Sequence, residues 1–134
     1  MSTLKVNTVQ HNTSGFNNVV QFTDGAGTEN GTLCRAWVNF NGTGVPTIIN
    51  DFNVNTIDDN GTGDYTINFS NSLGSASYAI SAVISVNGSV GTNGGWMTAL
   101  SRNADPTTSS CRVETFTSAG FAESDIATLA FFGE

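Results

Sequence analysis

The sequence has little charge of either sign, and basic residues are the scarcest. Only 11% of the 134 residues are charged, whereas soluble globular proteins usually carry roughly 25%. Four Lys and Arg residues against eleven Asp and Glu residues give a net charge of −7, so no basic stripe is present to neutralise nucleic-acid phosphates or an anionic membrane surface. We therefore expect no nucleic-acid binding and no membrane insertion.

Long apolar runs are also missing. No segment approaches the roughly 20 apolar residues that a membrane-spanning helix needs. The opening MSTLKVNTVQ lacks the charged and then apolar layout of a secretory signal. These features predict a protein that is made in a cytoplasm and stays there or leaves by lysis.

Residues for catalysis, cofactors and metals are few. The single histidine, His11, has no second His, Cys or carboxylate cluster beside it, and no Gly-x-Ser-x-Gly motif occurs. The cysteines, Cys34 and Cys111, form no Cys-x-x-Cys pair, and in a reducing cytoplasm we expect two buried thiols rather than a disulfide. We predict that the protein is not an enzyme and has no cofactor and no metal.

One oxygen-rich turn leaves an alternative open. Asp58–Asp64 brings three carboxylates together, as calcium-binding turns do, but it lacks the closing Glu of an EF-hand. A plain hairpin, whose Asp and Asn side chains cap its own backbone, is the interpretation that we favour. A glycosidase pair of carboxylates is also compatible with the spacing.

Short alternating segments, separated by clusters of Gly, Asn, Asp, Ser or Pro, fill most of the chain. This pattern predicts an all-β fold, an antiparallel β-sandwich of about seven to eight strands with a single core. Sustained helical periodicity is missing. The expected strands are Cys34–Phe40, Thr47–Ile49, Phe52–Asp58, Asp64–Phe69, Tyr78–Val86, Gly95–Leu100, Cys111–Phe116 and Ile126–Phe132.

Local patterns refine this prediction. Asn41-Gly42 and Asn60-Gly61 are strong signals for tight turns, because both residue types accept positive φ at little cost. In the expected strand Tyr78–Val86, one apolar face is shared by Tyr78, Ile80, Ala82, Ile84 and Val86. We expect this segment to be the clearest core strand.

Residues 1–33 differ from the rest. Two short apolar patches, one with Leu4 and Val6 and one with Phe16, are followed by the Gly-rich stretch Asp24–Gly31. Such a segment cannot bury much on its own. We predict an extended N-terminal arm over residues 1–33, which packs on the main domain or on a neighbouring subunit, and a β-sandwich domain over residues 34–134.

The final expected strand, Ile126–Phe132, is apolar on both faces, unlike an antiparallel strand with one wet face. It is either a central strand covered by its own chain or a strand with one face against other subunits around a symmetry axis. The second interpretation predicts a subunit interface that comprises Leu4, Val6, Phe16, Leu129, Phe131 and Phe132.

Two polar loops are candidates for ligand contact, Asn87–Trp96 and Ser101–Ser110. Loops at the end of a sandwich offer adaptable hydrogen bonds, and Trp96 can stack on a sugar ring or, alternatively, close the core. The predicted ligand-binding residues are Asn93, Trp96, Arg102, Asn103 and Asp105.

Two segments, CRAWVNFNGTG at Cys34–Gly44 and DDNGTGDYTINF at Asp58–Phe69, each combine a strand with an Asn-Gly-Thr-Gly turn. With the opening phrase STLKVNTVQ, they resemble small tail-fibre and other virion structural proteins of tailed phages, of the cyanophage and other aquatic types. The family often has a polar or basic residue where this sequence has Cys34.

The resemblance implies a homotrimeric tail-fibre or baseplate-associated protein of the phage virion. It also implies an N-terminal part that contacts other tail or baseplate proteins and variable loops that bind a receptor. We therefore expect host attachment, through a host-surface glycan, and a location in the phage tail after synthesis in the host cytoplasm. The alternative is an architectural virion, cement or baseplate accessory protein without a ligand.

Overall fold

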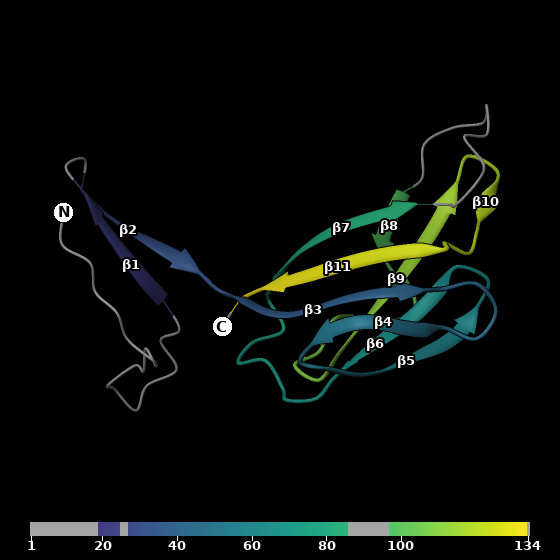
Figure 1. Ribbon diagram of the computed structural model, residues 1–134, viewed down its shortest axis with the longest axis horizontal. Helices are drawn as coiled ribbons and strands as arrows, with labels where there is room; N and C mark the ends of the chain where they lie inside the picture. Colours follow the sequence, from purple (N-terminus) through teal and green to yellow (C-terminus); the bar gives the residue numbers. More distant parts are fainter. Residues whose placement is uncertain (1–18, 25–26, 86–96, 134) are drawn as a thin grey trace.

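Antiparallel strands make up the fold (Figure 1). The computed structural model describes residues 19–24, 27–85 and 97–133, and these contain eleven strands and no helix. Two sheets, of four and five strands, enclose one core. The predicted all-β class and the two-sheet arrangement of a β-sandwich are confirmed.

Both sheets combine strands that are distant in sequence. The four-stranded sheet has the order β4 (Thr47–Phe52), β3 (Cys34–Asn41), β11 (Ile126–Phe132) and β7 (Ala79–Ser85). The five-stranded sheet has the order β10 (Gly120–Phe121), β9 (Ser110–Thr117), β6 (Asp64–Phe69) and β5 (Val54–Gly61), with β8 (Met97–Leu100) also paired to β9. At the two lateral edges of the sandwich, β4 contacts β5 and β7 contacts β8.

A third, two-stranded sheet precedes the sandwich. It is a hairpin of β1 (Val19–Asp24) and β2 (Gly27–Thr32), which stands beyond the end of the two larger sheets in Figure 1. These residues belong to the segment expected to be an extended arm, in which the sequence pattern predicts no strand. Residues 1–18 of that arm lie outside the described residues.

The core lies between the inward faces of the two larger sheets. Alternation along β3, β6 and β9 sends every second side chain inward. Aromatic rings meet edge to face, with centroids 5.2 Å apart for Phe40 and Tyr65 and 5.0 Å apart for Phe69 and Phe131. The buried apolar residues are Ala36, Val38, Phe40, Val54, Tyr65, Ile67, Phe69, Leu73, Cys111, Val113, Ala127, Leu129 and Phe131.

The turn after β3 is fixed by a contact across the sandwich. Tyr65 Oη, on β6, donates a hydrogen bond of 2.9 Å to the carbonyl of Gly42, and the Gly42 amide donates to the carbonyl of Ser124 at 2.8 Å. A Cβ atom at Gly42 would lie 2.5 Å from Tyr65 Oη. Glycine is therefore required for close approach here, whereas the positive φ of 64° belongs to Gly44.

The second predicted turn forms slightly later than its sequence signal suggested. Asn60-Gly61 belongs to the end of β5, and the chain reverses between Gly61 and Asp64, with φ of 132° at Gly61 and 67° at Gly63. Asp59 Oδ1 accepts a hydrogen bond from the Gly61 amide at 2.9 Å. The side chain thus caps its own turn, as expected of a plain hairpin.

The strand expected to be the clearest core strand is at an edge. β7 pairs only with β11 among the described strands, and Ile80 and Ile84 are only partly buried while Ala82 is exposed. That expectation was wrong because alternation identifies an apolar face but not the number of neighbours that cover it.

Asn53 is the corner at which the chain passes from the four-stranded to the five-stranded sheet. Its φ is 59°, the only positive value at a described non-glycine residue. Its Nδ2 donates to the carbonyls of Arg35 and Asn71 at 3.1 and 3.0 Å, and its Oδ1 accepts from the Asn71 amide at 2.8 Å. Asparagine tolerates this left-handed backbone better than most residues.

We predict that Asn53→Ala lowers the free energy of unfolding by about 2 kcal/mol, because it removes the four hydrogen bonds of the side chain and strains the backbone. Urea denaturation followed by circular dichroism measures this change. Asn53→Gly is the matched control, since it keeps the backbone conformation and should cost about 1 kcal/mol less than Ala. Equal stability of both variants and the original chain would contradict this role for the corner.

Candidate functional site

The carboxylates of the Asp58–Asp64 turn each bind a neighbour in the same chain. Asp58 Oδ2 accepts from Asn68 Nδ2 at 2.9 Å, and Asp64 receives two hydrogen bonds from Arg112, at 2.8 and 2.6 Å. Within the described residues, no group of three His, Cys, Asp or Glu side chains is placed to hold a metal ion. Two concave surfaces and one sheet face with exposed apolar residues carry the other candidate features.

The first concave surface is a cavity of about 380 Å³ on the outer side of the five-stranded sheet, which we call the Phe116 pocket. It lies where β8, β9 and β10 meet, and its walls are mainly apolar. Arg102 and Glu114 are its charged residues. The full lining is Ala99, Leu100, Arg102, Glu114, Phe116, Gly120 and Phe121.

Glu114 has an unusual position in this pocket. Alternation along β9 sends Cys111, Val113 and Thr115 into the core, so that Glu114 belongs to the outer face, yet its exposed fraction is only 5%. Its Oε1 accepts a hydrogen bond of 2.8 Å from Ser101 Oγ.

The loop after β8 holds this carboxylate in place. Ser101 is buried, and its Oγ accepts a hydrogen bond from the Asn103 amide at 3.1 Å while it donates to Glu114. The Ser101 amide donates to the carbonyl of Arg112 at 3.0 Å. The loop therefore holds the one carboxylate of this mainly apolar pocket in place.

Two phenylalanine rings form one side of the pocket. Phe116 and Phe121 lie edge to face, with centroids 6.4 Å apart and planes 85° apart. Phe121 remains 55% exposed and Leu100 is also exposed. Exposed aromatic faces beside a buried carboxylate are typical of a binding surface rather than of a structural core.

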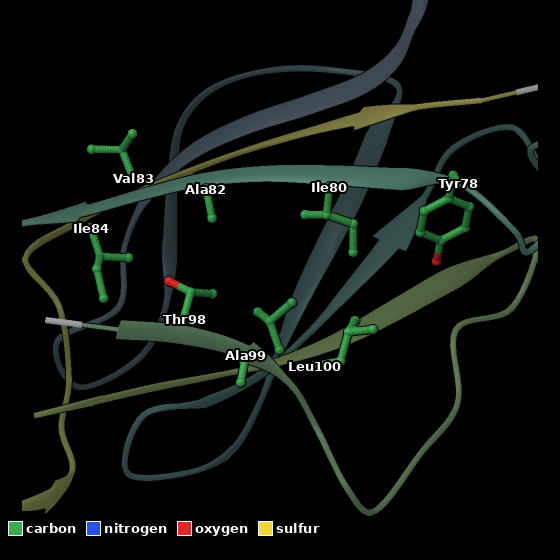
Figure 2. A pocket seen from close by; sticks show the side chains of 9 residues that line it. Tyr78, Ile80, Ala82, Val83, Ile84, Thr98, Ala99 and Leu100 are labelled. Carbon is green, nitrogen blue, oxygen red and sulfur yellow. The ribbon is translucent and has the colours of Figure 1, made fainter.

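The second concave surface is a groove of about 630 Å³ between β7 and β8, at the open lateral edge of the sandwich (Figure 2). Ile80, Ala82 and Ile84 point into it from β7, and Thr98 and Leu100 point toward them from β8. Thr98 Oγ1 is buried without a hydrogen-bond partner among the described residues. The groove is thus a partly uncovered extension of the core.

Tyr78 closes one end of the groove. Its Oη lies within hydrogen-bond distance of the carbonyls of Thr107 and Ser110, at 3.2 and 3.1 Å. Burial raises the pKa of Tyr78 well above its usual value of 10.0, and the neighbouring Cys111 thiol raises it further. Burial likewise raises the pKa of the Cys111 thiol.

The third surface is the outer face of the four-stranded sheet, which we define by Trp37, Phe52, Val83, Ile126, Thr128, Ala130 and Phe132. These residues are side by side in the strand register: Trp37 lies opposite Phe52 and Ala130, and Val83 lies opposite Thr128. All seven are uncharged. Val83 is 68% exposed and Phe132 36% exposed.

The structure separates the predicted interface residues. Leu129 and Phe131 are fully buried in the core of their own chain, so their side chains are not available to another subunit. Phe132 lies on the outer face, which leaves β11 a central strand that is covered on one side and partly exposed on the other. Leu4, Val6 and Phe16 lie outside the described residues.

The predicted ligand-binding residues are likewise divided. Arg102 lines the Phe116 pocket, the Asn103 amide supports Ser101 beneath it, and Asp105 is exposed in the same loop. Asn93 and Trp96 lie outside the described residues. Glu114, Phe116 and Phe121 are not among the residues predicted from the sequence, although the alternation in Arg112–Phe116 places an acid and an aromatic ring on one face.

The described residues include no helix long and apolar enough to span a membrane. Comparison with known protein families, characterised proteins and solved structures gives no match to this chain. Function must therefore be inferred from the residues and surfaces described above.

The buried Tyr65 and the half-buried Tyr78 predict a loss of stability in alkali. The pKa values of Tyr65 and Tyr78 are both raised in the folded protein, chiefly by burial, from 10.0. Unfolding then favours ionisation, so the free energy of unfolding should be constant below about pH 9 and fall above pH 10, by up to about 1.4 kcal/mol per pH unit for each tyrosine.

Thermal melts between pH 8 and pH 11 measure this loss. Tyr78→Phe should reduce the steepness of the decline, whereas Cys111→Ala tests the separate contribution of the thiol, whose pKa is also raised. A decline that is equally steep in Tyr78→Phe and in the original chain would contradict the assignment to Tyr78.

Proposed function

We propose that this protein is a virion structural protein of a tailed phage, a tail-fibre or baseplate component that attaches to a host-surface glycan as a homotrimer. Residues 1–33 would contact other tail or baseplate proteins, and the sandwich would face outward. The resemblance of Cys34–Gly44 and Asp58–Phe69 to tail-fibre and other virion proteins is the observation that carries this proposal.

The structure gives these two segments a common physical role. The first forms β3 and its turn, and the second forms the end of β5, its turn and β6. They meet through the Phe40–Tyr65 ring contact and the hydrogen bond from Tyr65 to Gly42. The residues that carry the resemblance are thus residues that build the sandwich. This supports a structural virion protein more directly than it supports any particular ligand.

The Phe116 pocket supports an attachment role. It contains Arg102 from a loop predicted to contact ligand, together with exposed aromatic surface. Sites that bind small groups combine apolar walls with a few positioned polar side chains, as this pocket does.

The outer face supports self-association. A chain with a net charge of −7 repels its copies, and that repulsion is weakest where carboxylates are missing, as they are among the seven residues that define the outer face. Val83, Phe52 and Phe132 expose apolar surface there, and such patches are typical of protein interfaces. The same face also favours the alternative of an architectural virion protein without a ligand.

We predict that Val83→Asp converts the oligomer into a folded monomer, because it places a charge at the most exposed apolar residue of the outer face. Light scattering coupled to size exclusion measures the mass, which should fall from about three times the 14.0 kDa of the chain to that of one chain. Val45→Asp, at an exposed loop residue outside this face, is the control and should leave the mass unchanged. An unchanged oligomer in Val83→Asp would remove the outer face from the interface.

Attachment predicts that the purified protein competes with phage. Fluorescently labelled protein should bind host cells and reduce phage adsorption, and periodate oxidation of surface sugars should abolish both effects. Binding that survives periodate would exclude a glycan receptor. If a correctly assembled oligomer bound no cells and blocked no adsorption, the architectural alternative would replace attachment.

A further inference from the structure

The position of Glu114 needs a physical explanation. A carboxylate on the outer face of a sheet would normally be hydrated, yet this one is 95% removed from solvent. Burying a charge is costly unless hydrogen bonds or an opposite charge compensate it. The described residues supply one hydrogen bond, from the neutral Ser101 hydroxyl.

The neighbouring Arg112 is already paired with another carboxylate. Arg112 forms the one salt bridge among the described residues, with Asp64, through Nε at 2.8 Å and Nη2 at 2.6 Å. The field of Glu114 reaches Arg112 and helps to raise the pKa of the guanidinium, after the larger effect of Asp64. Glu114 itself has no ion pair within the described part of the chain, so its carboxylate can pair with a cation that enters the pocket.

The surroundings of this charge select the kind of cation that would enter. Phe116, Phe121 and Leu100 form apolar walls, which disfavour a strongly hydrated inorganic ion. Aromatic faces attract organic cations, and ammonium groups that carry methyl groups use both the ring faces and the apolar walls. Arg102, which also lines the pocket and forms no salt bridge with Glu114, provides a partner for an anionic group next to that cation.

We propose that the Phe116 pocket binds an organic ammonium group of the choline type, with Glu114 facing the cation, Phe116 and Phe121 packing against its methyl groups, and Arg102 binding an adjacent phosphate. The ligand class is thus a phosphocholine-like zwitterion. This inference rests on the proposed attachment function, for which it names the substituent recognised on the surface glycan.

Titration of the full-length protein tests the proposal, with NMR or calorimetry as the readout. The probes are choline, phosphocholine and 3,3-dimethylbutan-1-ol, the uncharged isostere of choline. Choline should bind about tenfold more tightly than the isostere, because only choline carries the charge that Glu114 and the rings attract. Phosphocholine should bind more tightly than choline. Equal affinity for choline and the isostere, or no saturable choline binding, would overturn the proposal.

Three variants assign the contacts. Glu114→Gln keeps the shape of the side chain and should weaken choline binding about tenfold. Phe121→Ala removes an exposed ring without opening the core and should weaken it as well. Arg102→Gln should abolish only the advantage of phosphocholine over choline. Asp58→Asn is the control: it removes a distant charge on the same sheet, and this variant should bind choline as tightly as the original chain does.

The outcomes separate this inference from the proposed function. Unchanged choline affinity in both Glu114→Gln and Phe121→Ala would overturn the pocket assignment, even if the protein still binds cells and blocks adsorption. Equal affinity of choline and phosphocholine in the original chain would overturn the zwitterion class. Loss of cell binding in Glu114→Gln, together with loss of choline binding, would support both the pocket and its ligand.

Discussion

The arrangement of the sandwich depends on one buried side chain, Tyr65. Its ring fills the space between the sheets and packs on Phe40, while its hydroxyl must find an acceptor because an unpaired buried hydroxyl is costly. That acceptor is the carbonyl of Gly42, in a turn that tolerates no Cβ atom at this position. One residue thereby fixes the spacing of the two sheets and the course of the loop after β3.

The inward and outward faces of the two sheets have different roles. The inward faces are committed to packing, and so the two outward faces carry the features available for recognition. One outward face exposes apolar side chains, whereas the other has a charged pocket with aromatic walls. A protein with few charges can still present two chemically distinct surfaces when alternation assigns them to opposite sheets.

Much of the fold was predictable from the sequence because alternation and turn residues act locally. The all-β class and the inward faces of β3, β6 and β9 follow directly from them. The edge position of β7 and the burial of Leu129 and Phe131 depend instead on which strands become neighbours, which no local pattern encodes. For the same reason Arg102 was found as a loop residue, whereas Glu114 was missed: its burial requires Ser101 and the β8–β9 pairing to fold over it.

The two cysteines lie at different depths in the sandwich. Cys111 is fully buried beside Tyr78, and Cys34 is half-buried near the end of the sandwich, with its thiol donating to the Ala36 carbonyl at 3.2 Å. A thiol reagent can reach Cys111 only when the sheets separate, whereas Cys34 needs a smaller displacement. The ratio of the labelling rates of Cys111 and Cys34 therefore distinguishes opening of the whole core from fraying at its margin.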